Sequence, residues 1–160
     1  DFMVEGGKIW GTLPFPMLQL HNGNETYAYD ISAFNLMNYY EFVSDEYASL
    51  SLTHHFNGLF LNKIPLMNKL KWREVVSAKA VAGRLNPKSY EMMMFPNTLS
   101  NLKDPYYEAG FGIENIFQLL RIDLLWRLAY IDKKYVSAYE ALSTSKIPKF
   151  GIRGMLQFNF

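Results

Sequence analysis

Five charged residues between positions 106 and 130 could do chemistry together, because Glu108 and Glu114 have one parity and Arg121, Asp123 and Arg127 have the other, on either side of a turn near residues 117–118. Side chains alternate between the two faces of a strand, so charges at this spacing share a face if the stretch is a β-hairpin. The residue numbers of Glu108 and Arg127 have the same sum as those of Glu114 and Arg121, and one antiparallel register would therefore place both pairs directly opposite. Opposite charges facing each other across strands contribute about 0.2–1 kcal/mol per pair. We expect the set to line the polar interior of the fold and keep it wet and folded: Glu108, Glu114, Arg121, Asp123 and Arg127.

Catalytic and metal-binding residues are less well supported. His54 and His55 are adjacent, so on a strand they face opposite sides and cannot both line one site. Ser49, Ser51 and Asp45 could complete a hydrolase triad, but the sequence contains no nucleophile elbow. Three His, no Cys and scattered acidic residues make no metal-ligand spacing. We therefore expect no enzyme activity, no metal and no cofactor.

Composition excludes several other classes. The 160 residues carry 16 basic and 15 acidic side chains, a net charge of +1, which gives no reason to expect nucleic acid as a partner. The absence of Cys excludes disulfides and thiol chemistry. No run of about 18 apolar residues is present, so no transmembrane helix is expected. Aromatic residues make up 16% of the chain, a share that suits the aromatic girdles of an outer-membrane barrel.

The elements that must position these residues are strands with one apolar face. Residues 150–160 alternate, and the same alternation occurs in residues 47–56, 72–85 and 106–130. The strands of a transmembrane barrel need this pattern, and an amphipathic strand of a soluble sandwich also shows it. The apolar positions of the last stretch are Phe150, Ile152, Leu156, Phe158 and Phe160.

The connections between these strands favour the barrel. Residues 86–105 and 132–148 would be long loops, whereas residues 115–119 would be a short turn at the opposite end. Outer-membrane barrels place short turns on the periplasmic side and long loops outside. We also expect strands at residues 2–10 and 27–31 and a short helix within residues 59–70.

Three stretches resemble a known family: YYEAGFGIENIFQLLRIDLLWRLAY at 106–130, FGIRGMLQFNF at 150–160 and AFNLMNYYEFVSD at 33–45. They are similar to uncharacterised bacterial outer-membrane proteins that pair an N-terminal carboxypeptidase-regulatory-like sandwich with a C-terminal barrel. That barrel is similar to the surface-antigen superfamily, which includes the BAM and TAM assembly proteins. The most specific portion is Gly-x-Gly-x-x-Asn at 110–115 followed by Arg-x-Asp at 121–123.

The resemblance implies an all-β fold in which residues 1–160 are the C-terminal part of an antiparallel transmembrane β-barrel, sixteen-stranded when complete. It further implies that residues 33–45 form a loop inside the lumen, although this loop lacks the Arg-Gly-aromatic motif of the superfamily. Leu156, Phe158 and Phe160 resemble the C-terminal signal read by the barrel-assembly machinery. The residues of the candidate lumen plug are Phe34, Asn35, Tyr39, Tyr40, Glu41, Phe42 and Asp45.

The function that follows by resemblance is a non-enzymatic role in envelope biogenesis, of the assembly or translocation type, in the bacterial outer membrane. A pore or scaffold barrel within a larger complex is the alternative, and a lipid-modifying enzyme is the third hypothesis. Expected partners are outer-membrane lipid and lipopolysaccharide, other outer-membrane proteins, and the remaining strands of the same barrel. The chain opens in mid-pattern, so we expect it to be a C-terminal fragment or a processed product whose missing strands come from upstream or from another chain.

Overall fold

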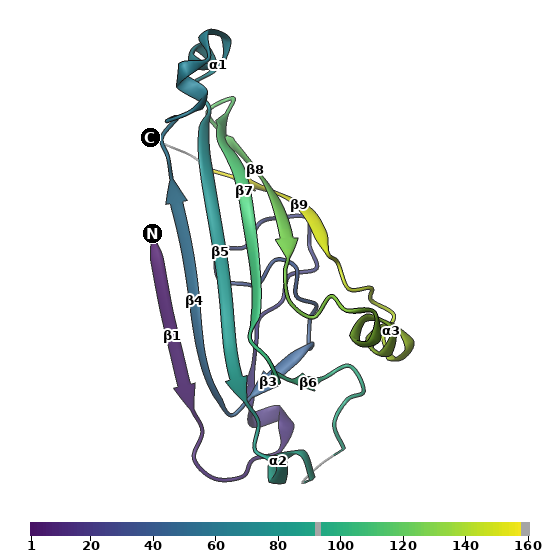
Figure 1. The fold of residues 1–160 in the computed structure, drawn as a ribbon. Helices are drawn as coiled ribbons and strands as arrows, with labels where there is room; N and C mark the ends of the chain where they lie inside the picture. The colour runs from purple at the N-terminus through teal and green to yellow at the C-terminus, as the bar shows by residue number, and fades with distance from the viewer. Residues whose placement is uncertain (92–93, 158–160) are drawn as a thin grey trace.

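A computed structural model describes residues 1–91 and 94–157 and is mostly β, with 42% strand and 16% helix (Figure 1). Its main feature is a six-stranded antiparallel sheet with the order β1-β4-β5-β7-β8-β9. The long strands thus follow one another as a meander, and the sheet is not closed. The strands are β1 (Phe2–Lys8), β4 (Glu46–His55), β5 (Arg73–Arg84), β7 (Tyr106–Ile116), β8 (Leu120–Arg127) and β9 (Phe150–Leu156).

A second, small sheet and several short helices occupy the connections. The small sheet has the order β2-β3-β6, with β2 antiparallel and β6 parallel to β3. Its strands are β2 (Gln19–Leu20), β3 (Phe42–Ser44) and β6 (Ser100–Asn101). The helices are η1 (Phe15–Met17), η2 (Leu61–Lys63), α1 (Pro65–Leu70), α2 (Pro87–Glu91) and α3 (Lys133–Leu142).

The ends of the sheet differ in the length of their connections. The turn between β7 and β8 lies at one end together with α1, whereas α2 lies at the opposite end (Figure 1). Because the strands are antiparallel, the connections 85–105 and 128–149 both leave the end that carries α2. This is the arrangement of long and short connections that the sequence predicts for residues 86–105, 115–119 and 132–148.

Three local predictions were wrong, and a fourth was confirmed in part. Residues 27–31 form no strand; within them only an isolated bridge joins Ala28 to Gly154. The short helix predicted within residues 59–70 is present as α1 with Pro65 in its first turn, although η2 occupies Leu61–Lys63 before it. The expected loop 132–148 contains α3, whose first turn is capped by the Asp132 side chain accepting from the backbone N–H of Tyr135. The strand that was expected to reach residue 130 ends at Arg127, and Tyr130 has a left-handed φ of 56°.

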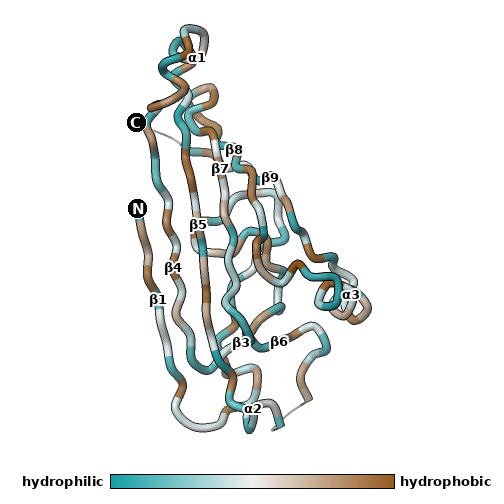
Figure 2. Tube along the Cα trace, in the orientation of Figure 1, coloured by the Kyte–Doolittle hydropathy of each residue, from teal (hydrophilic) through white to brown (hydrophobic). Residues whose placement is uncertain are grey.

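The two faces of the six-stranded sheet differ in character. Figure 2 shows hydrophilic and hydrophobic residues interspersed along the long strands. One face, here called the outer face, carries exposed apolar side chains on all six strands. The other, the inner face, carries the buried charges and is covered by residues 21–41, here called the docked segment. The exposed apolar residues of the outer face are Phe2, Val4, Leu50, Leu52, Val76, Tyr107, Phe111, Ile122, Trp126, Phe150, Ile152 and Leu156.

The apolar core lies between the inner face and the segments that cover it. Its largest cluster joins Phe34 and Met37 of the docked segment to Phe42 of β3, Val81 of β5 and Tyr106 of β7. Phe34 and Tyr106 meet edge to face at 5.4 Å between ring centroids, a favoured geometry for aromatic pairs. Tertiary packing therefore positions the docked segment against β5 and β7.

Candidate functional site: the charged inner face and its docked segment

A row of polar side chains crosses the inner face at the level of Glu108. The strand register places Ser51 opposite Lys79, Lys79 opposite Glu108, and Glu108 opposite Arg127. Lys79, Glu108 and Arg127 are all buried. Buried charges are costly unless they are paired or hydrogen-bonded, so the partners of this row decide what it can do.

Lys79 is bonded to the backbone of the docked segment. Its Nζ donates to the carbonyl oxygens of Asp30 and Ile31 at 2.8 Å each, and to that of Ala33 at 2.6 Å. An ammonium group has three donors, and all three are used here. The side chain of Lys79 therefore holds the turn at residues 30–33 on β5.

Glu108 binds the same segment from β7. Its carboxylate accepts from the backbone N–H of Asn35 at 2.7 Å and from that of Leu36 at 2.9 Å. The hydroxyl of Tyr106 donates a third bond at 3.0 Å. Asn35 is further held through its side chain, whose oxygen accepts from the Asn24 amide at 2.8 Å. The cation and the anion of this row thus bind carbonyls and amides of one short stretch.

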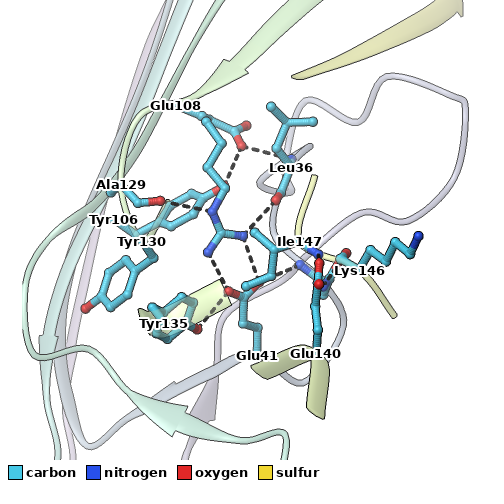
Figure 3. Close-up of polar contacts among 12 residues, drawn as sticks. Leu36, Glu41, Tyr106, Glu108, Ala129, Tyr130, Tyr135, Glu140, Lys146 and Ile147 are labelled. Atoms are coloured by element: carbon cyan, nitrogen blue, oxygen red, sulfur yellow. Dashed lines mark hydrogen bonds and ion pairs between the residues drawn. The ribbon is translucent and has the colours of Figure 1, made fainter. Parts of the chain in front are cut away.

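Arg127 completes the row with a buried ion pair. Its Nη2 and Nη1 donate to the two carboxylate oxygens of Glu41 at 2.5 and 3.1 Å, and neither side chain has any exposure. The guanidinium also donates to the backbone oxygen of Leu36 at 3.1 Å and to that of Ala129 at 3.0 Å. Figure 3 shows Glu41, Leu36 and Ala129 converging on this group.

Tyr135 of α3 joins the ion pair from outside the sheet. Its hydroxyl donates to Glu41 Oε1 at 3.0 Å (Figure 3). Burial and the nearby Glu41 carboxylate raise the pKa of Tyr135, so the phenol stays protonated and remains a donor. Glu41 therefore links the docked segment to both β8 and α3.

A second group of charges lies further along the inner face. Arg121 binds Asp123 through two hydrogen bonds of 2.8 and 2.7 Å, and both side chains are buried. The Tyr29 ring of the docked segment lies 4.7 Å from the Arg121 guanidinium, within cation–π range. On β9, Nη2 of Arg153 donates to the backbone oxygen of Asn35 at 3.1 Å. Strands β5, β7, β8 and β9 all hold the docked segment through charged side chains.

This geometry can be compared with known proteins. Residues 3–113 match the model of a family of unknown function (DUF5686), C-terminal domain. The chain belongs to this family. No curated protein and no solved structure matches the chain. The matched region of this DUF5686 domain contains β1, β4, β5, the docked segment and most of β7.

The predicted ion pairs of the hairpin are only partly reproduced in the DUF5686 domain. Glu108 lies directly opposite Arg127 as the residue numbers predict, but each binds the docked segment instead of the other. Glu114 and Arg121 are not paired, because the register shifts between Ile113 and Ile116. Glu114 bonds His55 Nδ1 at 3.0 Å instead. Asn115, within this irregular stretch, has a left-handed φ. The spacing of the charged residues gave no sign of this irregularity.

The candidate lumen-plug residues fall into two groups. Phe34, Asn35, Glu41 and Phe42 are buried against the inner face, whereas Tyr39 and Tyr40 are exposed. Asp45 lies just after β3, where its carboxylate accepts from the backbone N–H of Asn86 at 2.8 Å. The docked segment begins well before residue 33, since Asn24 and Tyr29 also contact the inner-face network.

Sequence reasoning missed Lys79, Arg153 and Tyr135 as parts of this site. Lys79 and Arg153 lie at inner-face positions of alternating strands, so their parity could have placed them beside Glu108 and Asp123. Tyr135 gave no such signal, because its helix was not predicted. Leu156 is exposed at the end of β9, and Phe158 and Phe160 lie outside the described residues.

The residues considered for catalysis or metal binding are not brought together in the part of the chain that the structure describes. His54 lies at an outer-face position and His55 at an inner-face one, and no hydrogen bond joins either to Ser49 or Ser51 among residues 1–91 and 94–157. The described residues include no group of three or more potential metal ligands. Among them, no helix is long and apolar enough to cross a membrane. The arrangement on the inner face is suited to holding a segment, since its charges are engaged with that segment and with one another.

Proposed function

We propose that this chain is the C-terminal part of a transmembrane β-barrel of the bacterial outer membrane, with a non-enzymatic role in envelope biogenesis. The observation that carries the proposal is an apolar row crossing the whole outer face. In the register of the sheet, Phe2 lies opposite Leu52, and Trp126 opposite Phe150, with two alanines on the strands between them. The full row is Phe2, Leu52, Ala78, Ala109, Trp126 and Phe150.

The distribution of burial supports a lipid-facing sheet. In a soluble protein a sheet buries its apolar face and leaves the polar face in water. Here the apolar outer face is bare, while the face with Lys79, Glu108 and Arg127 is covered. An exposed apolar surface that extends over six strands is typical of a membrane or interaction surface. Hydrocarbon would satisfy it without any further protein layer.

Completion of the barrel requires further strands. The sheet ends at β1 and β9, and lipid does not tolerate strand edges whose N–H and C=O groups lack partners. Among the described residues, the free edge of β9 is bonded by Tyr27 and Tyr29 at Gly154 alone. Membership of a family model described as a C-terminal domain is consistent with strands supplied by an upstream part of a longer protein or by another chain. By resemblance the complete barrel has sixteen strands.

The role in envelope biogenesis rests on the resemblance to the surface-antigen superfamily. The filled inner face favours a barrel that acts through its walls or loops and not through an open lumen. The proposed partners, lipopolysaccharide and other outer-membrane proteins, follow from the resemblance. The filled inner face also supports the scaffold alternative over an open pore, because the charges that would line a water path are bound to the docked segment. In a Gram-negative host, depletion of the complete protein should reduce insertion of other barrels. Normal insertion of those barrels would overturn the biogenesis role.

The membrane assignment is tested by placing a charge on the outer face. Leu52 and Leu59 are similarly exposed, at 47% and 52%, but Leu52 lies on the outer face of β4 and Leu59 in the turn after it. We expect Leu52→Arg to cost about 2–4 kcal/mol and to reduce outer-membrane integration, because the guanidinium would lie in hydrocarbon. Leu59→Arg should integrate normally. Detergent extraction of the membrane fraction measures both.

A soluble sheet would respond differently to the same substitution. On a soluble protein, a half-exposed leucine on a sheet surface can be replaced by arginine at a cost within about 0.5 kcal/mol. Equal behaviour of the two variants, with the chain recovered in the aqueous fraction without detergent, would exclude the barrel.

A further inference from the structure

A cavity of about 580 Å³ lies between α3 and residues of the stretches 85–91 and 97–103, at the end of the sheet that carries the long connections. This volume is within the usual range of small-molecule sites. The cavity is separate from the inner-face network, although Tyr135 of α3 borders both. Its lining has two chemically distinct parts.

The first part is a run of tyrosine rings. Tyr135 meets Tyr130 edge to face at 4.9 Å between centroids, and it stacks with Tyr139 at 6.3 Å. The hydroxyl of Tyr135 is used by Glu41, and that of Tyr130 donates to the Asp104 carbonyl at 2.6 Å. These two tyrosines therefore present their rings to the cavity, with their polar ends already satisfied elsewhere.

The second part is a set of polar side chains without partners. The side chains of Asn97, Ser100 and Asn101 line the cavity and make no hydrogen bond within residues 1–91 and 94–157. Lys103 and Glu91 supply one charge of each sign. Two amides and a hydroxyl thus remain free to bind an occupant beside an aromatic surface.

We infer that this cavity binds a neutral saccharide. A sugar ring has C–H faces that pack on tyrosine rings and hydroxyl groups that pair with amides, so it matches both parts of the lining. An acyl chain would cover Asn97 and Asn101 without pairing them, and leaving polar groups unpaired is costly. An anion or a cation finds no net charge to attract it, because Lys103 and Glu91 offset each other. The inference does not depend on the membrane assignment.

The test is calorimetric titration of the full chain with neutral trisaccharides of glucose, mannose or N-acetylglucosamine. Neutral oligosaccharide released from lipopolysaccharide forms a second arm, which distinguishes an envelope source from a free glycan. We expect one of these probes to bind. The double variant Asn97→Ala, Asn101→Ala should bind it at least tenfold more weakly, because two amide partners are lost.

Two further variants separate binding from folding. Ala138 lies on the cavity side of α3, and Ala138→Trp should abolish binding by filling the space while preserving the helix. Asn68→Ala on α1, at the far end of the sheet, should leave affinity unchanged. Absence of binding to every probe at millimolar concentration would overturn the inference, and so would binding that persists in the double variant and in Ala138→Trp.

Discussion

Arg127 and Glu41 form an ion pair in which neither side chain is exposed to water. Removing one partner of such a pair leaves an uncompensated buried charge, whereas replacing both with apolar residues can be nearly neutral. Here the pair also joins two elements far apart in sequence, the docked segment and β8. The ion pair therefore positions the docked segment on the sheet and also stabilises the fold.

We expect Arg127→Met to lower the free energy of unfolding by about 3–5 kcal/mol, because Glu41 would remain buried and unpaired. The double variant Arg127→Met, Glu41→Leu should recover much of this loss. Arg73→Met, at an exposed position of β5, is the control and should change stability by less than about 0.5 kcal/mol. Urea unfolding in detergent micelles measures all three. Additive effects of the two substitutions would show that the pair is not coupled.

His21 makes the stability of the docked segment depend on pH. Burial lowers the pKa of His21 to about 4, and its Nε2 lies 2.9 Å from Ser44 Oγ. The unfolded chain takes up this proton near pH 6.5 and the folded chain only near pH 4. The free energy of unfolding should therefore be highest above pH 6.5, and it should fall by up to about 3 kcal/mol as the pH drops towards 4.

The substitution His21→Gln should flatten the pH dependence of unfolding between pH 4 and 6.5, whereas replacement of the exposed His54 by Gln should not. Unfolding free energies measured across this interval decide the point. A slope that survives in His21→Gln would assign the effect to another group.

At the scale of the element, the glycines of β7 make room for side chains of the neighbouring strands. A Cβ at Gly112 would lie 2.5 Å from Asp123 Oδ1, and one at Gly110 would lie 2.5 Å from Ser77 Oγ. At Gly154 of β9, the nearest atom would be 3.8 Å away. The close approach that these glycines permit is thus between β7 and its sheet neighbours.

We predict that Gly112→Ala costs about 1–3 kcal/mol, since overpacking would displace Asp123 from Arg121. Gly154→Ala should be neutral or slightly stabilising, because alanine reduces the freedom of the unfolded chain. Thermal unfolding of the two variants gives the comparison. A neutral effect at both glycines would show that the Arg121–Asp123 pair can shift at little cost.

At the scale of the whole molecule, the sheet is apolar outside and charged inside, and the docked segment binds the charges. Lys79 and Arg127 bind carbonyl oxygens of that segment, and Glu108 binds its amides. Within the proposed barrel, the path along the inner face is therefore occupied. A barrel filled in this way should not conduct ions, whereas an open pore should.

The complete protein should show no steady conductance steps in planar bilayers. The variant Lys79→Met should admit intermittent current, because the carbonyls at residues 30–33 would lose their only bonds to β5. A conservative exchange, Lys79→Arg, should remain closed or nearly so. Stable wild-type steps of uniform size would favour the pore alternative.

The sequence by itself determined the six long strands and the face of the sheet to which each of their side chains points. Alternation placed Leu52, Trp126 and Ile152 on one face and Glu108, Arg127 and Arg153 on the other, since the parity of a strand follows directly from residue number. The family resemblance, in turn, implied that residues 33–45 form a loop on the polar, inner side. Strand parity is a local property, so it can be read from spacing.

Only the tertiary structure decided the partners. Glu108 and Arg127 are opposite each other in the register, yet their bonds go to Asn35, Leu36 and Glu41, which are distant in sequence. The shift near Asn115 separated Glu114 from Arg121, and α3 brought Tyr135 to Glu41. A buried charge binds whichever groups the folded chain brings nearest, and sequence spacing does not specify those groups.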